Sequence, residues 1–190
     1  MTWVIISLIL LAAFGPVLWL VPSKRDRHLS TLREQARREG LIVELRRLPK
    51  LNPSPDERVT AGGRVKEPVV ECTAYTYALT RRLVWLPGWR LLREEGHPQP
   101  VPGWVFDPDL KAAGAEFDAS LKSIDALFGG LPADVIGVEL SARTLTLYWL
   151  EGGAARRETV TSLSALLRAA QDRLFTVDDR FQPKSDDEDS

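Results

Sequence analysis

The chain has few of the residues on which metal sites and nucleophilic active sites depend. It contains one cysteine, Cys72, and two histidines, His28 and His97. A single cysteine excludes an intramolecular disulfide, which agrees with a reducing compartment. Neither histidine lies at metal-ligand spacing from the other or from the cysteine, and no Gly-Gly pair continues into the Lys-Ser/Thr of a phosphate-binding loop. The sequence therefore predicts no metal and no cofactor.

Neither sign of charge dominates the composition. The 190 residues contain 25 Lys and Arg against 26 Asp and Glu, which excludes a globally basic nucleic-acid-binding protein and predicts no nucleic-acid partner. The charge is nevertheless unevenly placed. Residues 24–50 hold nine basic and four acidic side chains, whereas residues 178–190 hold two basic and six acidic ones.

One long hydrophobic run opens the sequence. Residues 2–21 carry no ionisable side chain, and a helix of that length spans roughly 30 Å, the thickness of a bilayer core. Trp3 and Trp19 lie near the two ends, where indole rings prefer the headgroup region. A cleaved signal peptide would need a basic segment before the run and small residues near a cleavage site, and the sequence provides neither. We therefore predict a transmembrane anchor over residues 1–22.

Three basic residues, Lys24, Arg25 and Arg27, directly follow this run and are expected to lie at the membrane surface. No Lys or Arg precedes the run, so the positive-inside rule places the N-terminus outside and the rest of the chain in the cytoplasm. The predominance of Arg over Lys is typical of GC-rich bacterial genomes. We thus expect a bacterial, single-pass protein of the cell inner membrane, with the lipid bilayer as its first partner.

A basic juxtamembrane helix is predicted for residues 23–40. Ser23 suits its N-cap, with Asp26 three residues later as in a capping box, and Gly40 suits its end. The apolar stripe is thin and consists of Leu29, Leu32 and Ala36. Two interpretations stay open: a helix attracted to anionic lipid headgroups, or a solvated connector whose charges only fix the topology.

Residues 41–176 predict a cytoplasmic domain of class α+β, because short turns join neighbouring strands and imply largely antiparallel pairing. The expected strands are 41–48, 69–79, 81–85, 89–93, 135–140, 144–150 and 156–160, and the expected helices are 107–128 and 162–175. The fold is thus an N-terminal single transmembrane helix followed by a largely antiparallel α+β soluble domain. Residues 177–190 are predicted to form an acidic disordered tail.

Local patterns refine three of these elements. In the strand 69–79, Thr73 and Tyr75 should face one side of the sheet and Cys72 the other. The Leu-Pro-Gly segment 86–88 suggests a hairpin turn. Asp107 should cap the helix that follows it, with a proline at the first helical position.

Three groups of side chains could carry chemistry, and each has a simpler structural explanation. Cys72 and His97 could form a nucleophile and base, but a lone cysteine in a strand is usually a small buried hydrophobe. The two aspartates on either side of Pro108 are explained by helix capping. Glu116 and Asp118 fall on the polar side of the same helix. We predict no catalytic residue.

Trp85, Trp89 and Trp104 are the remaining unusual feature, together with the prolines around them. On exposed loops, tryptophan and proline side chains could form a partner surface. Tryptophan is also simply a large core residue, and two of these three flank a turn across which they could pack. We favour the core interpretation and keep the three residues as a candidate partner surface.

The first third of the sequence resembles the YajC family. The hydrophobic run, the basic residues and the charged helix are followed by residues 56–65, DERVTAGGRV. YajC proteins are small bacterial inner-membrane proteins that accompany the Sec translocon, and their small β domain carries a D-E-V-x-T-x-G-G-like turn. The resemblance implies a Sec-associated role at the inner membrane. This chain departs from the pattern by an extra strand and a Pro-rich loop before the motif, and by the long sequence after it.

Three functional hypotheses follow. The first is a membrane-tethered, non-enzymatic interaction protein, an accessory or assembly subunit of an inner-membrane complex with a membrane-protein partner. The second is a membrane-anchored ligand-sensing module in which two α+β halves enclose a pocket. The third is a hydrolase that uses Cys72 or a carboxylate. We expect the first.

Overall fold

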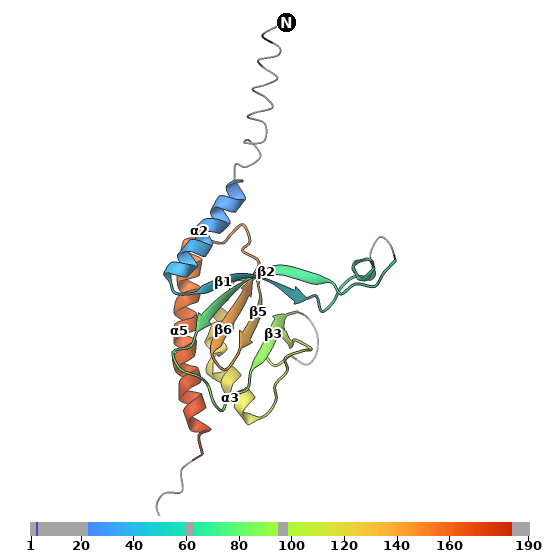
Figure 1. Ribbon diagram of the computed structural model, residues 1–190. Helices are drawn as coiled ribbons and strands as arrows, with labels where there is room; N and C mark the ends of the chain where they lie inside the picture. Colours follow the sequence, from blue (N-terminus) through green and yellow to red (C-terminus); the bar gives the residue numbers. More distant parts are fainter. Residues whose placement is uncertain (1–2, 4–22, 60–62, 95–98, 184–190) are drawn as a thin grey trace, which may run out of the picture.

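The computed structural model describes Trp3 and residues 23–59, 63–94 and 99–183 (Figure 1). The predicted anchor over residues 1–22 lies outside these residues except for Trp3, and the end of the acidic tail, residues 184–190, also lies outside them. Among the described residues, no helix combines the length and the apolar character that crossing a membrane requires.

Six strands form one antiparallel sheet in the order β1-β2-β6-β5-β3-β4. The strands are β1 (Ile42–Pro49), β2 (Val69–Ala78), β3 (Trp89–Arg93), β4 (Trp104–Phe106), β5 (Val135–Leu140) and β6 (Thr144–Trp149). The α+β class is therefore confirmed. In the described residues all six strands belong to this one sheet, so they do not divide into two separate sheets.

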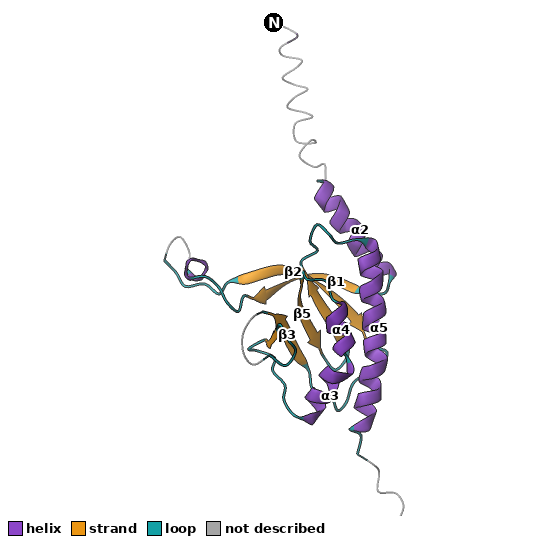
Figure 2. Cartoon of the chain, turned by 180° about the vertical axis from the view of Figure 1, so that it is seen from behind, coloured by secondary structure: helices purple, strands orange, loops and turns teal. Residues whose placement is uncertain are grey.

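Helices cover one face of this sheet (Figure 2). They are α2 (Lys24–Arg38), α3 (Ala115–Ser123), α4 (Asp125–Gly130) and α5 (Arg157–Arg180), and a short 3-10 helix, η1, spans Pro55–Arg58. The main core lies between the helices and the sheet, and Trp89, Trp149, Leu147 and Leu167 are fully buried in it. The opposite face carries only a small cluster around Leu48, Cys72, Ala74, Leu92 and Tyr148.

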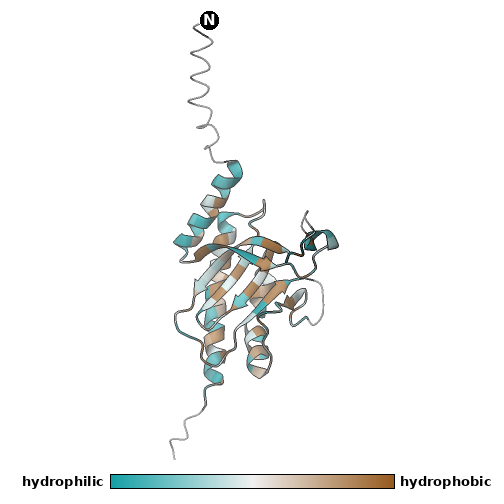
Figure 3. Ribbon diagram, turned by 45° about the vertical axis from the view of Figure 1, so that its right-hand side comes forward, coloured by the Kyte–Doolittle hydropathy of each residue, from teal (hydrophilic) through white to brown (hydrophobic). Residues whose placement is uncertain are grey.

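Helix α2 begins as the sequence predicts, with both hydrogen bonds of the capping box between Ser23 and Asp26. Most of its residues are hydrophilic (Figure 3). Leu32 and Ala36, however, are completely buried in the main core, where α2 packs against α5. The thin apolar stripe is thus sufficient to dock the helix, and α2 packs as part of the folded domain.

Helix α5 is longer than expected at both ends. It includes most of residues 156–160, which the sequence predicts as a strand, because Val160 lies on the same buried face as Leu163 and Leu167. It also extends beyond residue 176, and Val177 and Asp178 are buried. The expected start of a disordered tail at residue 177 is therefore wrong, since this part of the chain completes the core.

The predicted hairpin of 81–85 with 89–93 does not form. Residues 81–88 contain no strand, and β3 pairs with β4 and β5 instead. The physical reason is the carboxylate of Asp178 in α5, which accepts hydrogen bonds from the backbone N–H groups of Val84, Trp85 and Leu86 at 2.8–3.1 Å. Those donors are then unavailable to a neighbouring strand.

The long helix predicted for residues 107–128 begins only at Ala115 and is interrupted at Ile124. Asp107 does not cap it. The side chain is fully buried and forms an ion pair with Arg90 at 2.8 Å, while the Asp107 N–H donates to the Arg90 carbonyl. After Asp107 the chain makes a turn, in which the Leu110 N–H donates to the Asp107 carbonyl at 3.2 Å and the Asp109 N–H to the Asp107 carboxylate at 2.9 Å. The chain turns into α3 only at Gly114, at φ 107°.

Candidate functional site

The outer edge of β1 presents unpaired backbone groups. The Lys50 N–H donates to the Pro68 carbonyl at 2.9 Å, in register with the pairing of β1 and β2. Because backbone groups alternate in direction along a strand, the even-numbered residues of β1 bond to β2 and the odd-numbered ones point away from it. Among the described residues nothing bonds to the outward N–H and C=O groups of Val43, Leu45 and Arg47. These three residues define the open edge.

Two of the three side chains of the open edge, those of Leu45 and Arg47, are exposed, whereas Val43 is partly buried against the main core. Leu45, at its centre, is 73% exposed, and Ile42 at one end is 51% exposed. Charged side chains lie next to Leu45 on the same strand. Arg46 bonds to Glu44 of β1, and Arg47 bonds to Glu71 of β2. Beyond Thr73 toward the hairpin tip, β2 has no pairing with β6, so the β1–β2 hairpin projects past the rest of the sheet (Figure 1).

A buried carboxylate joins α2 to the strands beside this edge. Glu151 follows β6 and is 5% exposed. It accepts hydrogen bonds from Arg33 Nε and Nη2 (3.0 and 2.5 Å), from Thr73 Oγ1 (2.7 Å) and from Tyr75 Oη (2.6 Å). We call these four residues the Glu151 lock. Every lone pair of the carboxylate that faces the protein has a donor, which is the condition for burying a charge at tolerable cost.

Electrostatics keep the lock ionised. Burial acts to raise the pKa of the Glu151 carboxyl, but the hydrogen bonds from Arg33, Tyr75 and Thr73 outweigh it and lower the pKa below its ordinary value. Burial and the neighbouring carboxylate raise the pKa of Tyr75, so its hydroxyl stays a donor. Glu151 holds a φ of 52°, an uncommon backbone conformation for a residue other than glycine. The surrounding contacts therefore hold the carboxylate in place against some local strain.

The lock and the open edge are direct neighbours. Thr73 of the lock pairs with Leu45 across the β1–β2 ladder. Arg33 lies in α2, whose first turn carries Lys24, Arg25 and Arg27 with exposed side chains. The helix that follows the hydrophobic run is thus rigidly attached beside the centre of the open edge.

The three tryptophans do not form one surface. Trp89 and Trp104 are buried, and both rings pack against Phe128. Trp85 is 40% exposed beside Val84, on the loop that Asp178 holds. The candidate partner surface of three residues is therefore wrong for two of them.

The candidate catalytic residues are spread over the fold. Cys72 is buried on the face opposite the helices, and burial raises the pKa of its thiol to about 11, which leaves little nucleophilic thiolate. His97 lies outside the described residues. In the part of the chain that the structure describes, no three His, Cys, Asp or Glu side chains come together as metal ligands.

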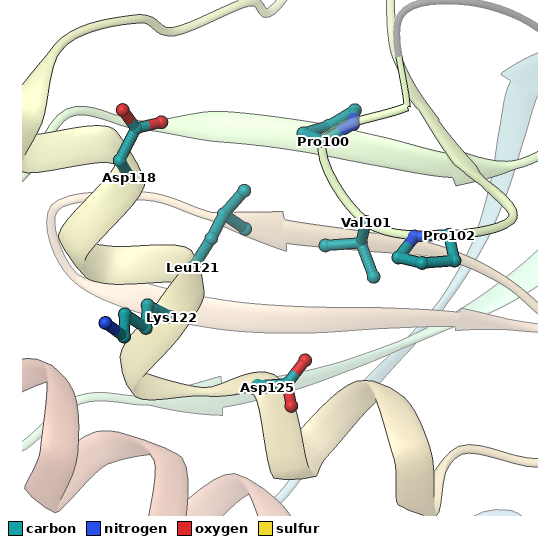
Figure 4. A pocket seen from close by; sticks show the side chains of 7 residues that line it. All are labelled: Pro100, Val101, Pro102, Asp118, Leu121, Lys122 and Asp125. Carbon is teal, nitrogen blue, oxygen red and sulfur yellow. The ribbon is translucent and has the colours of Figure 1, made fainter.

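One surface hollow is open and lined by both polar and apolar side chains. It has a volume of about 480 Å³ and lies between the loop at Pro100, Val101 and Pro102 and the residues Asp118, Leu121, Lys122 and Asp125 of α3 and α4 (Figure 4). The charged side chains lie around its rim and do not converge on one point (Figure 4). The arrangement offers no defined site for a small molecule.

The chain matches no protein-family model, no curated protein and no solved structure. The comparisons thus do not test the resemblance to YajC, whose most characteristic segment is residues 56–65. In that segment Glu57 accepts hydrogen bonds from Lys50 and from the Ser54 N–H, which closes the loop at η1. Residues 60–62 lie outside the described part.

Proposed function

We propose that the protein is a membrane-tethered, non-enzymatic interaction protein that presents the open edge of β1 to a partner at the cytoplasmic face of the inner membrane. The observation that carries the proposal is the open edge itself. Unpaired backbone groups on a long, exposed strand are a template for an added strand, a common mode of protein recognition. An accessory or assembly subunit of a membrane complex needs such a surface and no catalytic machinery.

The tether supports this role. Residues 2–21 have the length and composition of a transmembrane helix, and the exposed Lys24, Arg25 and Arg27 follow directly. The Glu151 lock then fixes the position of α2 relative to β1. Restricting the edge to a thin layer beside the membrane raises its effective concentration for partners in the same membrane.

The buried ionisable groups also support a structural role. Glu151, Asp178 and Asp107 are each less than one tenth exposed, and each is bonded to arginines or to backbone N–H groups of the same chain. Such groups hold the fold together. A catalytic acid or base needs a free position for its substrate.

The decisive experiment is a proline substitution that removes one outward N–H. Leu45→Pro leaves the β1–β2 ladder intact, because the Leu45 N–H points away from β2. The full chain is solubilised in mild detergent and its mass is measured by light scattering. We expect the wild type in a larger assembly, Leu45→Pro as a single chain, and Leu45→Ala, which keeps the N–H, to retain most of the assembly. An unchanged assembly with proline at position 45 would refute the proposal.

The orientation has its own test. Alkaline phosphatase fused after Ser190 is active only outside the cytoplasm, and a green fluorescent protein at the same place fluoresces only inside. We expect fluorescence and no phosphatase activity. Replacing Lys24, Arg25 and Arg27 by Gln and adding Lys-Arg after Met1 should invert part of the population. Phosphatase activity of the wild-type fusion would place the domain on the other side of the membrane and contradict the proposal.

A further inference from the structure

The residues of β1 are complementary to a second copy of β1. In an antiparallel pair related by a two-fold axis through Leu45, each outward residue faces an outward residue of the other copy. Val43 then lies opposite Arg47 of the second copy, Leu45 lies opposite itself, and all three outward residues form hydrogen bonds. The two open edges satisfy each other completely.

The side chains of β1 also favour this register. Glu44 lies opposite Arg46 of the second copy and Arg46 opposite its Glu44, so two ion pairs form across the axis. Ile42 lies opposite Leu48, and the exposed Leu45 side chains meet each other. Cross-strand pairs of opposite charge and of apolar residues stabilise antiparallel sheets, whereas like charges placed opposite each other destabilise them.

Neighbouring registers are unfavourable. The outward groups can bond only if the strand moves in steps that keep odd residues opposite odd residues. The neighbouring allowed register in one direction places Glu44 opposite Glu44 of the second copy. The neighbouring allowed register in the other direction places Arg46 opposite Arg46 of the second copy. Among these three registers, only the one centred on Leu45 avoids both repulsions, so the charges of β1 favour that alignment over its two neighbours.

The symmetry of the pairing also fixes where the two helical layers lie. The two-fold axis of a continuous antiparallel sheet is perpendicular to the sheet, so the helical layers of both copies lie on the same side. Helix α2 belongs to that layer. Helix α2 of each copy therefore lies on the same side of the joined sheet.

We propose that the partner of the open edge is a second copy of this chain, and that two copies join their sheets by antiparallel pairing of β1 with β1, centred on Leu45. This inference deepens the proposed function and rests on it. The interface is isologous, as in most symmetric dimers. The interface buries only one strand edge and few side chains. Anchoring both copies in the same membrane raises their effective concentration and so favours this small contact.

The first test is cross-linking of the full chain in its membrane. In a Cys72→Ala background, Leu45→Cys places two thiols on paired Cα atoms about 5.5 Å apart, within the range of a disulfide. We expect a covalent dimer after mild oxidation. The control Ile42→Cys, also exposed, places the two thiols about 20 Å apart along the strands and should give none. Equal yields from the two variants would overturn the proposal.

The second test exchanges charges. Glu44 and Arg46 have side chains 50% and 59% exposed, so changing them leaves the fold intact. Glu44→Arg alone and Arg46→Glu alone should each lose at least tenfold in yield of the Leu45→Cys dimer. A mixture of the two variant chains restores opposite charges at every cross-strand position and should recover the dimer, as should the double exchange in one chain. Absence of recovery in both cases would overturn the register.

These outcomes separate the two proposals. If Leu45→Pro leaves the assembly unchanged, the open edge is not a docking site and the proposed function fails. If Leu45→Pro dissociates the assembly but Leu45→Cys gives no dimer, the edge binds an extended segment of a different protein, and only the present inference fails.

Discussion

The two edges of the sheet differ in how they are protected. Strand β4 is three residues long, and Trp104 and Val105 are buried. The Trp104 N–H, which would point outward, donates instead to the Val101 carbonyl at 2.9 Å. Strand β1 is eight residues long, most of its side chains are exposed, and its outward groups have no partner among the described residues.

The comparison shows that one edge of this sheet is covered and the other is not. A turn that folds back on β4 satisfies its outward N–H at the cost of a few residues, and natural proteins generally cover exposed edges in this way. On β1 only charged side chains discourage pairing, and these charges alternate in sign. We infer that the outward backbone groups of β1 are left unpaired because a partner binds to them.

The largest expected effect comes from removing the lock beside β1. Glu151→Ala leaves Arg33, Thr73 and Tyr75 without their acceptor, and breaking a buried charged network costs roughly 3 kcal/mol. We expect the melting temperature to fall by about 10 °C. Leu45→Ala, on the exposed side of the same ladder, should change it by less than about 2 °C. Similar losses for the two variants would contradict the account of the lock.

On the β4 side, Asp107→Ala should destabilise the protein by about 2 kcal/mol, because Arg90 and the Asp109 N–H lose their buried acceptor. The effect should be smaller than that of Glu151→Ala, since Arg90 keeps its ion pair with Glu139. Chemical denaturation monitored by tryptophan fluorescence measures the free energy of unfolding of both variants. Adding Glu139→Gln to Asp107→Ala should lower the free energy of unfolding by more than the sum of the two single losses, because Arg90 then loses both of its ion pairs. A loss equal to that sum would contradict a network shared by the three residues.

Acid should weaken the lock. The pKa of Glu151 in the folded protein lies below its ordinary value of 4.5, so the carboxylate contributes stability above that pH. The contribution is lost as the pH falls through the lowered pKa. The wild type should therefore lose stability on acidification more steeply than Glu151→Gln. Parallel pH profiles would show that the folded-state pKa is not lowered.

The smallest expected effect is that of Leu45→Pro, which tests the two directions in which backbone groups point along β1. Leu45→Pro removes an outward N–H and should cost less than about 1 kcal/mol, whereas Glu44→Pro removes an N–H that bonds to β2 and should cost about 3 kcal/mol. Urea titrations of the two full-length variants in detergent measure the difference. Equal costs would mean that the outward direction of the odd-numbered residues is wrong.

Elements with strong local patterns could be predicted from the sequence. The strand at Val69–Ala78, the β5–β6 hairpin and the centre of α5 are confirmed, because their apolar periodicity matches the side that is buried. The predictions failed where a distant charge decides the local structure. Asp178 holds residues 84–86 away from a strand, and Arg90 keeps the chain after Asp107 from starting a helix.

The site was less predictable than the fold. Arg33 and Glu151 are 118 residues apart, and neither position has a local signal for their contact. The open edge depends on which strand ends up outermost, which follows from the order of all six strands. The alternation of Glu44 and Arg46 was visible in the sequence, but its meaning appears only once β1 is known to be an edge.

Amide hydrogen exchange tests the central claim most directly. The full chain is placed in lipid nanodiscs that hold either one copy or two, and exchange is measured at single residues of β1. With one copy, the account predicts fast exchange at Val43, Leu45 and Arg47 and slow exchange at Glu44 and Arg46. With two copies, the three fast amides should become slow as well. Fast exchange of those three amides in both preparations would contradict the claim that the β1 edge pairs with a second copy.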